Sequence, residues 1–173
     1  IICIFMILAG VNFSLYFFLL TGRAREFFKN TELKAYFGIL FASILIITIF
    51  LVPQTNNIKE AFRLAAFQSA TIMSTTGFAT ADYELWLPAA QLVLFFLMFV
   101  GGSSGSTSGG VKVIRWVILG KQMHNEAKQM LHPHGVFSIR LNGEVGRKEV
   151  IYNVSAFFFL YFNSFCCSKR RIK

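Results

Sequence analysis

The sequence predicts an all-helical integral membrane protein built on a helix–pore loop–helix repeat whose second helix is broken. Three observations support this fold class. Hydrophobic residues make up 55% of the 173 residues, they gather in long uncharged runs, and the basic residues collect in alternate links between those runs. A soluble domain of this length needs a larger polar surface, so lipid is the expected outer solvent.

Four apolar runs are candidate membrane-crossing helices. The first, residues 1–21, carries no charge and is long enough as a helix to cross about 30 Å of hydrocarbon. The others are residues 36–52, the interrupted run 87–119, and residues 150–167. Because the chain starts with Ile and no basic segment precedes the first run, we expect an internal piece of a longer protein rather than a signal peptide.

The links between these runs differ in charge. Residues 22–35 and 120–149 hold most of the basic residues, whereas residues 53–86 hold only Lys59 and Arg63 beside three acidic residues. The positive-inside rule therefore predicts that links 22–35 and 120–149 are cytoplasmic. The net charge of +9 is explained by this topology, and no nucleic acid partner is expected.

The link after residue 52, which holds few basic residues, has the pattern of a half-helix and not that of a solvated loop. Residues 53–57 supply a turn, and Asn57 followed by Glu60 matches a capping box, so a pore helix is expected over residues 58–74. About 15 residues of helix rise about 22 Å, which reaches the middle of the bilayer without crossing it. The alternative is an amphipathic helix that lies on the outer surface.

Residues 75–80, which follow the pore helix, form the candidate filter. A helix C-terminus brings about half a negative charge to the membrane centre, where non-helical backbone is tolerated only beside protein or a wet path. Gly77 permits a turn with positive φ, and Asp82 and Glu84 would concentrate cations at the outer exit. Carbonyl oxygens can replace the hydration shell of a cation. The candidate ligands are the main-chain oxygens of Thr75, Thr76, Gly77, Phe78 and Ala79.

The run 87–119 is interrupted by a candidate gate loop. A continuous helix would be about 50 Å long, more than the hydrocarbon core requires. Five of the ten residues 101–110 are glycine, and each glycine costs a helix about 1 kcal/mol relative to alanine. After the loop, Lys112 and Arg115 are equally candidates for a role in gating or for anchoring the helix end. The gate loop consists of Gly101, Gly102, Ser103, Ser104, Gly105, Ser106, Thr107, Ser108, Gly109 and Gly110.

The gate loop has two other interpretations. A phosphate-binding loop needs a lysine directly after the last glycine and then a hydroxyl residue, but here Val111 precedes Lys112 and Val113 follows it. A flexible Gly/Ser linker between two domains is the second alternative. Both flanks of the loop are apolar enough to lie in the membrane, which favours an intramembrane loop.

Two motifs carry a family resemblance. Phe67-Gln68-Ser69 leading into residues 74–80, together with the loop 101–112, resembles the Trk/Ktr/HKT superfamily of potassium transporters and within it the bacterial TrkH type. The resemblance covers about residues 1–162 and implies four fused helix–pore loop–helix repeats in a pseudo-fourfold, cation-channel-like fold. It assigns residues 1–21 to the last helix of the second repeat, 36–119 to the complete third repeat, and 150–167 to the truncated first helix of the fourth.

The resemblance also implies a function. Such a protein takes up potassium across the bacterial inner membrane, with residues 75–79 as one of four filter strands and residues 101–110 as the loop that blocks the pathway below them. K⁺ is the transported ion, and no cofactor is expected on this chain. The implied partners are membrane lipid, a second copy of the full-length protein, and a cytoplasmic nucleotide-binding regulatory subunit (TrkA/KtrA-like) that docks on residues 120–149.

Several features leave alternatives open. After Phe162 the sequence no longer matches the family, and the basic end 168–173 suggests truncation or a shifted reading frame. One filter strand cannot surround an ion, so the chain alone should not conduct. The rivals are a homotetrameric pore-loop channel and a non-conducting scaffold, whereas an enzyme lacks candidate residues. Isolated cysteines and histidines are expected to be structural or solvated: Cys3, Cys166, Cys167, His124, His132 and His134.

Overall fold

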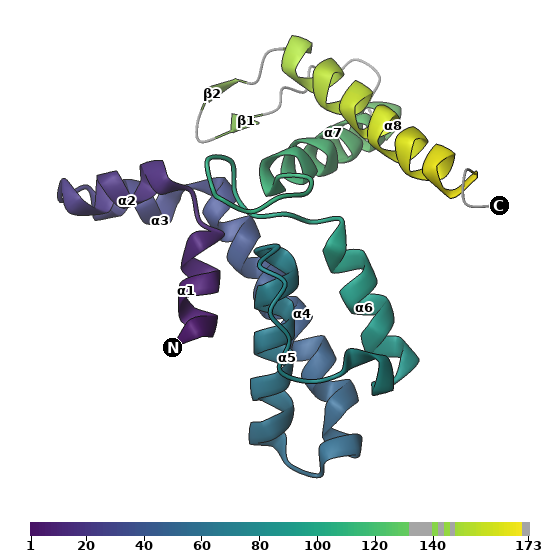
Figure 1. Cartoon of the computed structure of the whole chain (residues 1–173). Coiled ribbons are helices and arrows are strands. Elements are labelled where there is room, and N and C mark those ends of the chain that lie inside the picture. Colours follow the sequence, from purple (N-terminus) through teal and green to yellow (C-terminus); the bar gives the residue numbers. More distant parts are fainter. Residues whose placement is uncertain (132–139, 142–143, 146–147, 171–173) are drawn as a thin grey trace. The chain divides into compact units, whose positions relative to one another are not determined.

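The computed structural model describes residues 1–131, 140–141, 144–145 and 148–170 (Figure 1). It separates into two compact units, Ile1–Ile114 and Arg115–Lys173, which are described one at a time. Most of the described residues are helical. The exceptions are the irregular filter and gate segments of the first unit and a short hairpin in the second.

The first apolar run forms two helices and not the single continuous helix that we expected over residues 1–21. Helix α1 spans Ile2–Ala9 and α2 spans Phe13–Leu20, with a bend of 99° between them. Asn12 starts α2, because its side chain accepts a hydrogen bond from the Ser14 amide. The corner leaves the Gly10 carbonyl free to accept a hydrogen bond from another segment.

After the short helix α3 (Ala24–Lys29), helix α4 spans Thr31–Thr55. Its start lies five residues before the predicted residue 36, because the Asn30 side chain accepts hydrogen bonds from the amides of Glu32 and Leu33. Within the described residues, α4 is the one helix that is long and apolar enough to cross a membrane alone, and the bent α1–α2 pair makes a second span if it counts as one. Exposed apolar side chains such as Phe41, Leu45 and Ile49 run along α4.

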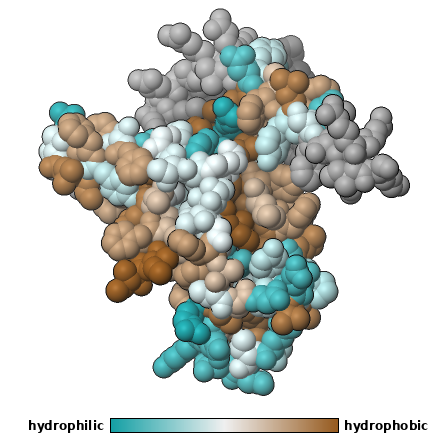
Figure 2. Space-filling view, viewed as in Figure 1, coloured by the Kyte–Doolittle hydropathy of each residue, from teal (hydrophilic) through white to brown (hydrophobic). Residues whose placement is uncertain are grey.

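Helix α5 spans Ile58–Met73 and runs back along α4 (Figure 1). The Asn57 side chain caps its first turn by accepting a hydrogen bond from the Lys59 amide. Ala61, Ala65 and Ala70 are buried, and such small side chains let two helix backbones approach closely. The α4–α5 turn carries hydrophilic side chains, whereas α1 is covered by hydrophobic ones (Figure 2).

The first unit ends with the interrupted run. The 3₁₀ helix η1 (Tyr83–Leu85) leads into α6 (Pro88–Met98), which packs against α4 and α5, and the next helix, α7, begins only at Val113. The break therefore lies at residues 99–112, close to the predicted loop 101–110.

In the second unit, α7 continues to Leu131 and a hairpin joins β1 (Arg140–Leu141) to β2 (Glu144–Val145) before α8 (Lys148–Arg170). Gly120 does not end the helix, so α7 extends well into the region 120–149 that we expected to be a link. The rings of Trp116 and Phe158 form a T-shaped pair with their centroids 4.8 Å apart, and this contact packs α7 against α8. The hairpin is a small departure from an all-α chain.

Some predicted features fall outside the described residues. His132, His134 and residues 171–173 are not described, nor are the side chains of Cys166 and Cys167. His124 is exposed on α7.

Candidate functional site

Helix α5 ends in a Schellman motif that leads directly into the candidate filter. The Thr76 amide donates to the Thr71 carbonyl over 3.0 Å, and the Thr75 amide donates to the Ile72 carbonyl over 3.1 Å. This motif needs a left-handed residue at the position of Thr75, whose φ is +54°. Glycine is the usual residue there, and a β-branched residue in that region is a genuine outlier.

The strained backbone conformation of Thr75 is held in place by a contact that the sequence alone does not indicate. The Thr75 side-chain oxygen accepts a hydrogen bond of 2.8 Å from the Gly109 amide, 34 residues further along the chain. Ser74 contributes a second constraint, because its hydroxyl donates to the Ala70 carbonyl and lies 2.6 Å from the Thr76 hydroxyl. Local strain of about 1–3 kcal/mol is typical of functional sites, where the surrounding structure holds it.

The filter segment is non-helical backbone with a left-handed turn at Gly77. Gly77 has a φ of +81°, as the sequence predicted, and a Cβ placed on it would meet nothing within 4 Å. No described residue donates a hydrogen bond to the carbonyl oxygens of residues 75–79. Carbonyl oxygens that have no partner inside the chain remain available to a ligand, and a cation is the ligand that they suit.

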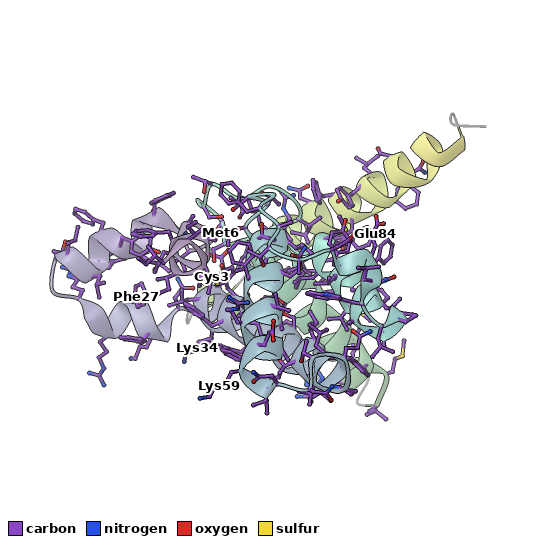
Figure 3. All side chains as sticks on the ribbon, turned by 60° about the horizontal axis from the view of Figure 1, so that its bottom comes forward. Cys3, Met6, Phe27, Lys34, Lys59 and Glu84 are labelled. Atoms are coloured by element: carbon purple, nitrogen blue, oxygen red, sulfur yellow. The ribbon has the colours of Figure 1, made fainter. Side chains whose placement is uncertain are left out.

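A cavity of about 750 Å³ lies beside the filter segment, between it, α5 and α6. Gln68 and Thr71 line this cavity, and their side-chain oxygens are buried without a hydrogen-bond partner among the described residues. Glu84 also lines the cavity and lies on the α6 side of the unit, away from Cys3 and Met6 (Figure 3). The Asp82 carboxylate accepts a hydrogen bond from the Glu84 amide and so starts η1.

The two ends of the candidate gate loop, residues 100–101 and 111, pair with each other and are called its neck. The Gly101 amide donates to the Val111 carbonyl over 2.9 Å, and Val100 and Val111 form a parallel bridge. Because the pairing is parallel, the chain leaves the loop in the direction in which it entered. A Cβ on Gly101 would lie 2.0 Å from the Gly109 carbonyl oxygen, so this neck closes only with glycine at residue 101.

Hydrogen bonds fix the loop to neighbouring segments of the first unit, so it is more ordered than the flexible backbone suggested by its composition. The α1–α2 corner is the first segment: the Ser103 amide donates to the Gly10 carbonyl over 2.9 Å, and the Phe13 amide donates to the Gly105 carbonyl over 3.2 Å. The second segment is the filter, through Gly109 and Thr75.

Lys112 and Arg115, which the sequence left equal, have different surroundings. The Lys112 ammonium donates hydrogen bonds to the carbonyl oxygens of Ser106 and Ser108, which lie inside the loop. The Arg115 guanidinium lies 3.7 Å above the centre of the Phe157 ring, a cation–π contact within the second unit. The structure therefore associates Lys112 with the loop and Arg115 with packing between α7 and α8.

Known proteins resemble this chain in sequence and in fold. The Trk system potassium uptake protein TrkH of Escherichia coli K12 is 34% identical over 166 residues, which cover 93% of this chain and 34% of that protein. TrkH of Vibrio parahaemolyticus is 32% identical, with coverage of 91% and 34%. The crystal structure of the potassium transporter TrkH from Vibrio parahaemolyticus matches with a TM-score of 0.88 at 31% identity, covering 95% of this chain and 36% of that one.

The chain thus spans about a third of the length of these relatives. The family model described as TrkH, cation transport protein, matches all of residues 1–173. The chain belongs to the TrkH family of cation transport proteins.

Proposed function

We propose that this chain is part of a potassium uptake transporter of the bacterial inner membrane, in which it supplies one strand of the ion filter and the loop that gates the pathway beneath it. The observation that carries this proposal is the Thr75–Gly109 hydrogen bond, which brings the gate loop against the filter segment. The proposal is supported further by the carbonyl oxygens of residues 75–79, which accept no hydrogen bond within the described part of the chain, and by the names of the matched relatives, which are potassium uptake proteins.

The main-chain oxygens of residues 75–79 act as ion ligands in this proposal. A dehydrated K⁺ must be surrounded on all sides, and one strand covers only part of its surface. The remaining three strands come from other repeats of a pseudo-fourfold protein, in which residues 36–119 form the third repeat. The α1–α2 pair then belongs to the second repeat and α8 to the fourth, and the chain alone does not conduct.

The proposal also includes a membrane topology and binding partners. Links 22–35 and 120–149 face the cytoplasm, which places the filter on the outer side and the gate loop on the inner side of the pathway. The full-length protein is a homodimer, and the basic part of α7 after Gly120 is the docking surface for a cytoplasmic nucleotide-binding regulatory subunit.

The gate is tested by deleting Ser103–Ser108 from the complete transporter. The deletion removes the contacts with the α1–α2 corner, while Val100 and Val111 remain to rejoin the chain. Each lost hydrogen bond contributes about 1 kcal/mol net, so the closed state loses enough free energy to raise K⁺ flux about tenfold or more. Rubidium uptake into proteoliposomes measures this flux, with the unaltered transporter as reference. Equal flux in the two proteins would remove the gate from the proposal.

A further inference from the structure

Glu32 is a buried acidic residue that has no role in the proposed ion pathway. It lies in the first turn of α4, and only 4% of its surface is exposed. An ionised carboxylate is costly to bury unless hydrogen bonds replace its lost hydration. Its partners therefore indicate what it does in the fold.

Both carboxylate oxygens of Glu32 bind one residue of the gate loop. Oε1 accepts a hydrogen bond from the Ser104 amide, and Oε2 accepts one of 2.9 Å from the Ser104 hydroxyl. Hydrogen bonds to an ionised acceptor are roughly twice as strong as neutral ones. The two residues are 72 positions apart in the sequence, so this pair fastens the loop to the start of α4.

The shape of the loop presents Ser104 to Glu32. Ser103 to Ser106 form a turn that is closed by the Ser106 amide donating to the Ser103 carbonyl over 3.2 Å. Gly105 occupies the third position of the turn with a φ of +71°, a conformation that glycine adopts without strain. The amide of Ser104 takes no part in closing the turn and points to the carboxylate.

We propose that Glu32 is a positioning residue that latches the gate loop in its blocking position. The loop is then held at three separate places: Gly109 binds Thr75 beside the filter, Ser103 and Gly105 bind the α1–α2 corner, and Ser104 binds Glu32 at the start of α4. Release of the Glu32 contact leaves the turn that carries Ser104 attached through its hydrogen bonds to Gly10 and Phe13, while the neck at Val100 and Val111 stays closed. This inference rests on the proposed gate function of the loop.

A purely structural role for Glu32 is the alternative, because an acidic residue in the first turn of any helix interacts favourably with the helix dipole. The chain offers a matched control for this effect. Glu60 is the acidic residue in the first turn of α5 and is exposed. Glu60→Ala therefore removes the same dipole interaction without touching the loop.

The experiment measures rubidium flux and the K⁺/Na⁺ permeability ratio of the complete transporter in proteoliposomes. We expect Glu32→Ala to raise basal flux about tenfold, Glu32→Gln and Ser104→Ala to raise it less, and Glu60→Ala to leave it unchanged. The permeability ratio should stay constant in all four variants, because the latch does not touch the filter. A combined Glu32→Ala and Ser104→Ala protein should show no more flux than Glu32→Ala alone, since both changes remove one interaction.

Unchanged or reduced flux in Glu32→Ala, Glu32→Gln and Ser104→Ala overturns the latch. If Glu32→Ala cannot be recovered from membranes, the other two single variants decide the question by the same readout. The Ser103–Ser108 deletion separates this failure from that of the gate itself. Raised flux in the deletion with unchanged flux in the Glu32 variants rejects only the latch, whereas unchanged flux in both rejects the gate as well.

Discussion

Substitution of Gly77 by serine in the complete transporter should lower K⁺ uptake about tenfold and reduce the preference for K⁺ over Na⁺. Gly77 has a φ of +81°, where an L side chain costs about 1–2 kcal/mol. Relief of that strain rotates the backbone, so the neighbouring carbonyl oxygens no longer share one direction. A loss of 1.4 kcal/mol of ion binding corresponds to a factor of ten.

The matched control for this substitution is Gly22→Ser. Gly22 has a φ of +79° and, like Gly77, has nothing within 4 Å of an added Cβ. The two variants therefore carry the same backbone strain in equally open surroundings, and only Gly77 belongs to the filter. Growth at limiting potassium and competition between rubidium and sodium in uptake measure the difference. If the two variants behave alike, the proposal that Gly77 takes part in ion binding is wrong, and the interpretation as a non-conducting scaffold is favoured.

Gly101→Ala should have the second large effect, through the gate loop. A Cβ at residue 101 would lie 2.0 Å from the Gly109 carbonyl oxygen, which belongs to the backbone and cannot rotate away. The neck of the loop therefore opens, and the Gly109 amide moves from Thr75. Overpacking of this kind typically costs about 1–3 kcal/mol, which predicts a rise in basal rubidium flux of about tenfold.

Gly38→Ala in α4 is the control for Gly101→Ala, because a Cβ there meets nothing within 4 Å. It should leave flux and protein yield unchanged. A Gly101→Ala protein that reaches the membrane in normal amount with unaltered flux would show that closure of the neck does not control the pathway.

Much of the architecture could be predicted from composition and periodicity. The family assignment is confirmed by the family match over residues 1–173 and by the likeness to TrkH proteins, and the described residues contain one or two candidate membrane-crossing helices. The helical character of the chain agrees with that likeness, apart from the β1–β2 hairpin. The assignment of filter and gate roles stays a prediction.

The helix boundaries were less predictable, because short polar signals compete with apolar runs. Asn12 is a polar residue within a largely apolar stretch and starts a new helix, which an average hydrophobicity over the run conceals. Asn30 likewise starts α4 ahead of its apolar stretch. The predicted link 120–149 begins at Gly120, yet a single glycine costs a helix only about 1 kcal/mol, and α7 continues through it.

The contacts of the site could not be predicted, because they join residues far apart in the chain. Thr75 is a poor sequence candidate for the left-handed conformation, and its hydrogen bond to Gly109 becomes visible only in the folded chain. Glu32 lies among basic residues in a link that the sequence predicts to be cytoplasmic, so nothing in the sequence connects it with Ser104.

The most direct test of the account locates the ion. Crystals of the complete transporter grown with rubidium or thallium would show these ions by anomalous scattering. The account predicts ion density in direct contact with the main-chain oxygens of Thr75 to Ala79. Density confined to other places, with Gly77 packed against acyl chains or facing bulk water, would contradict it.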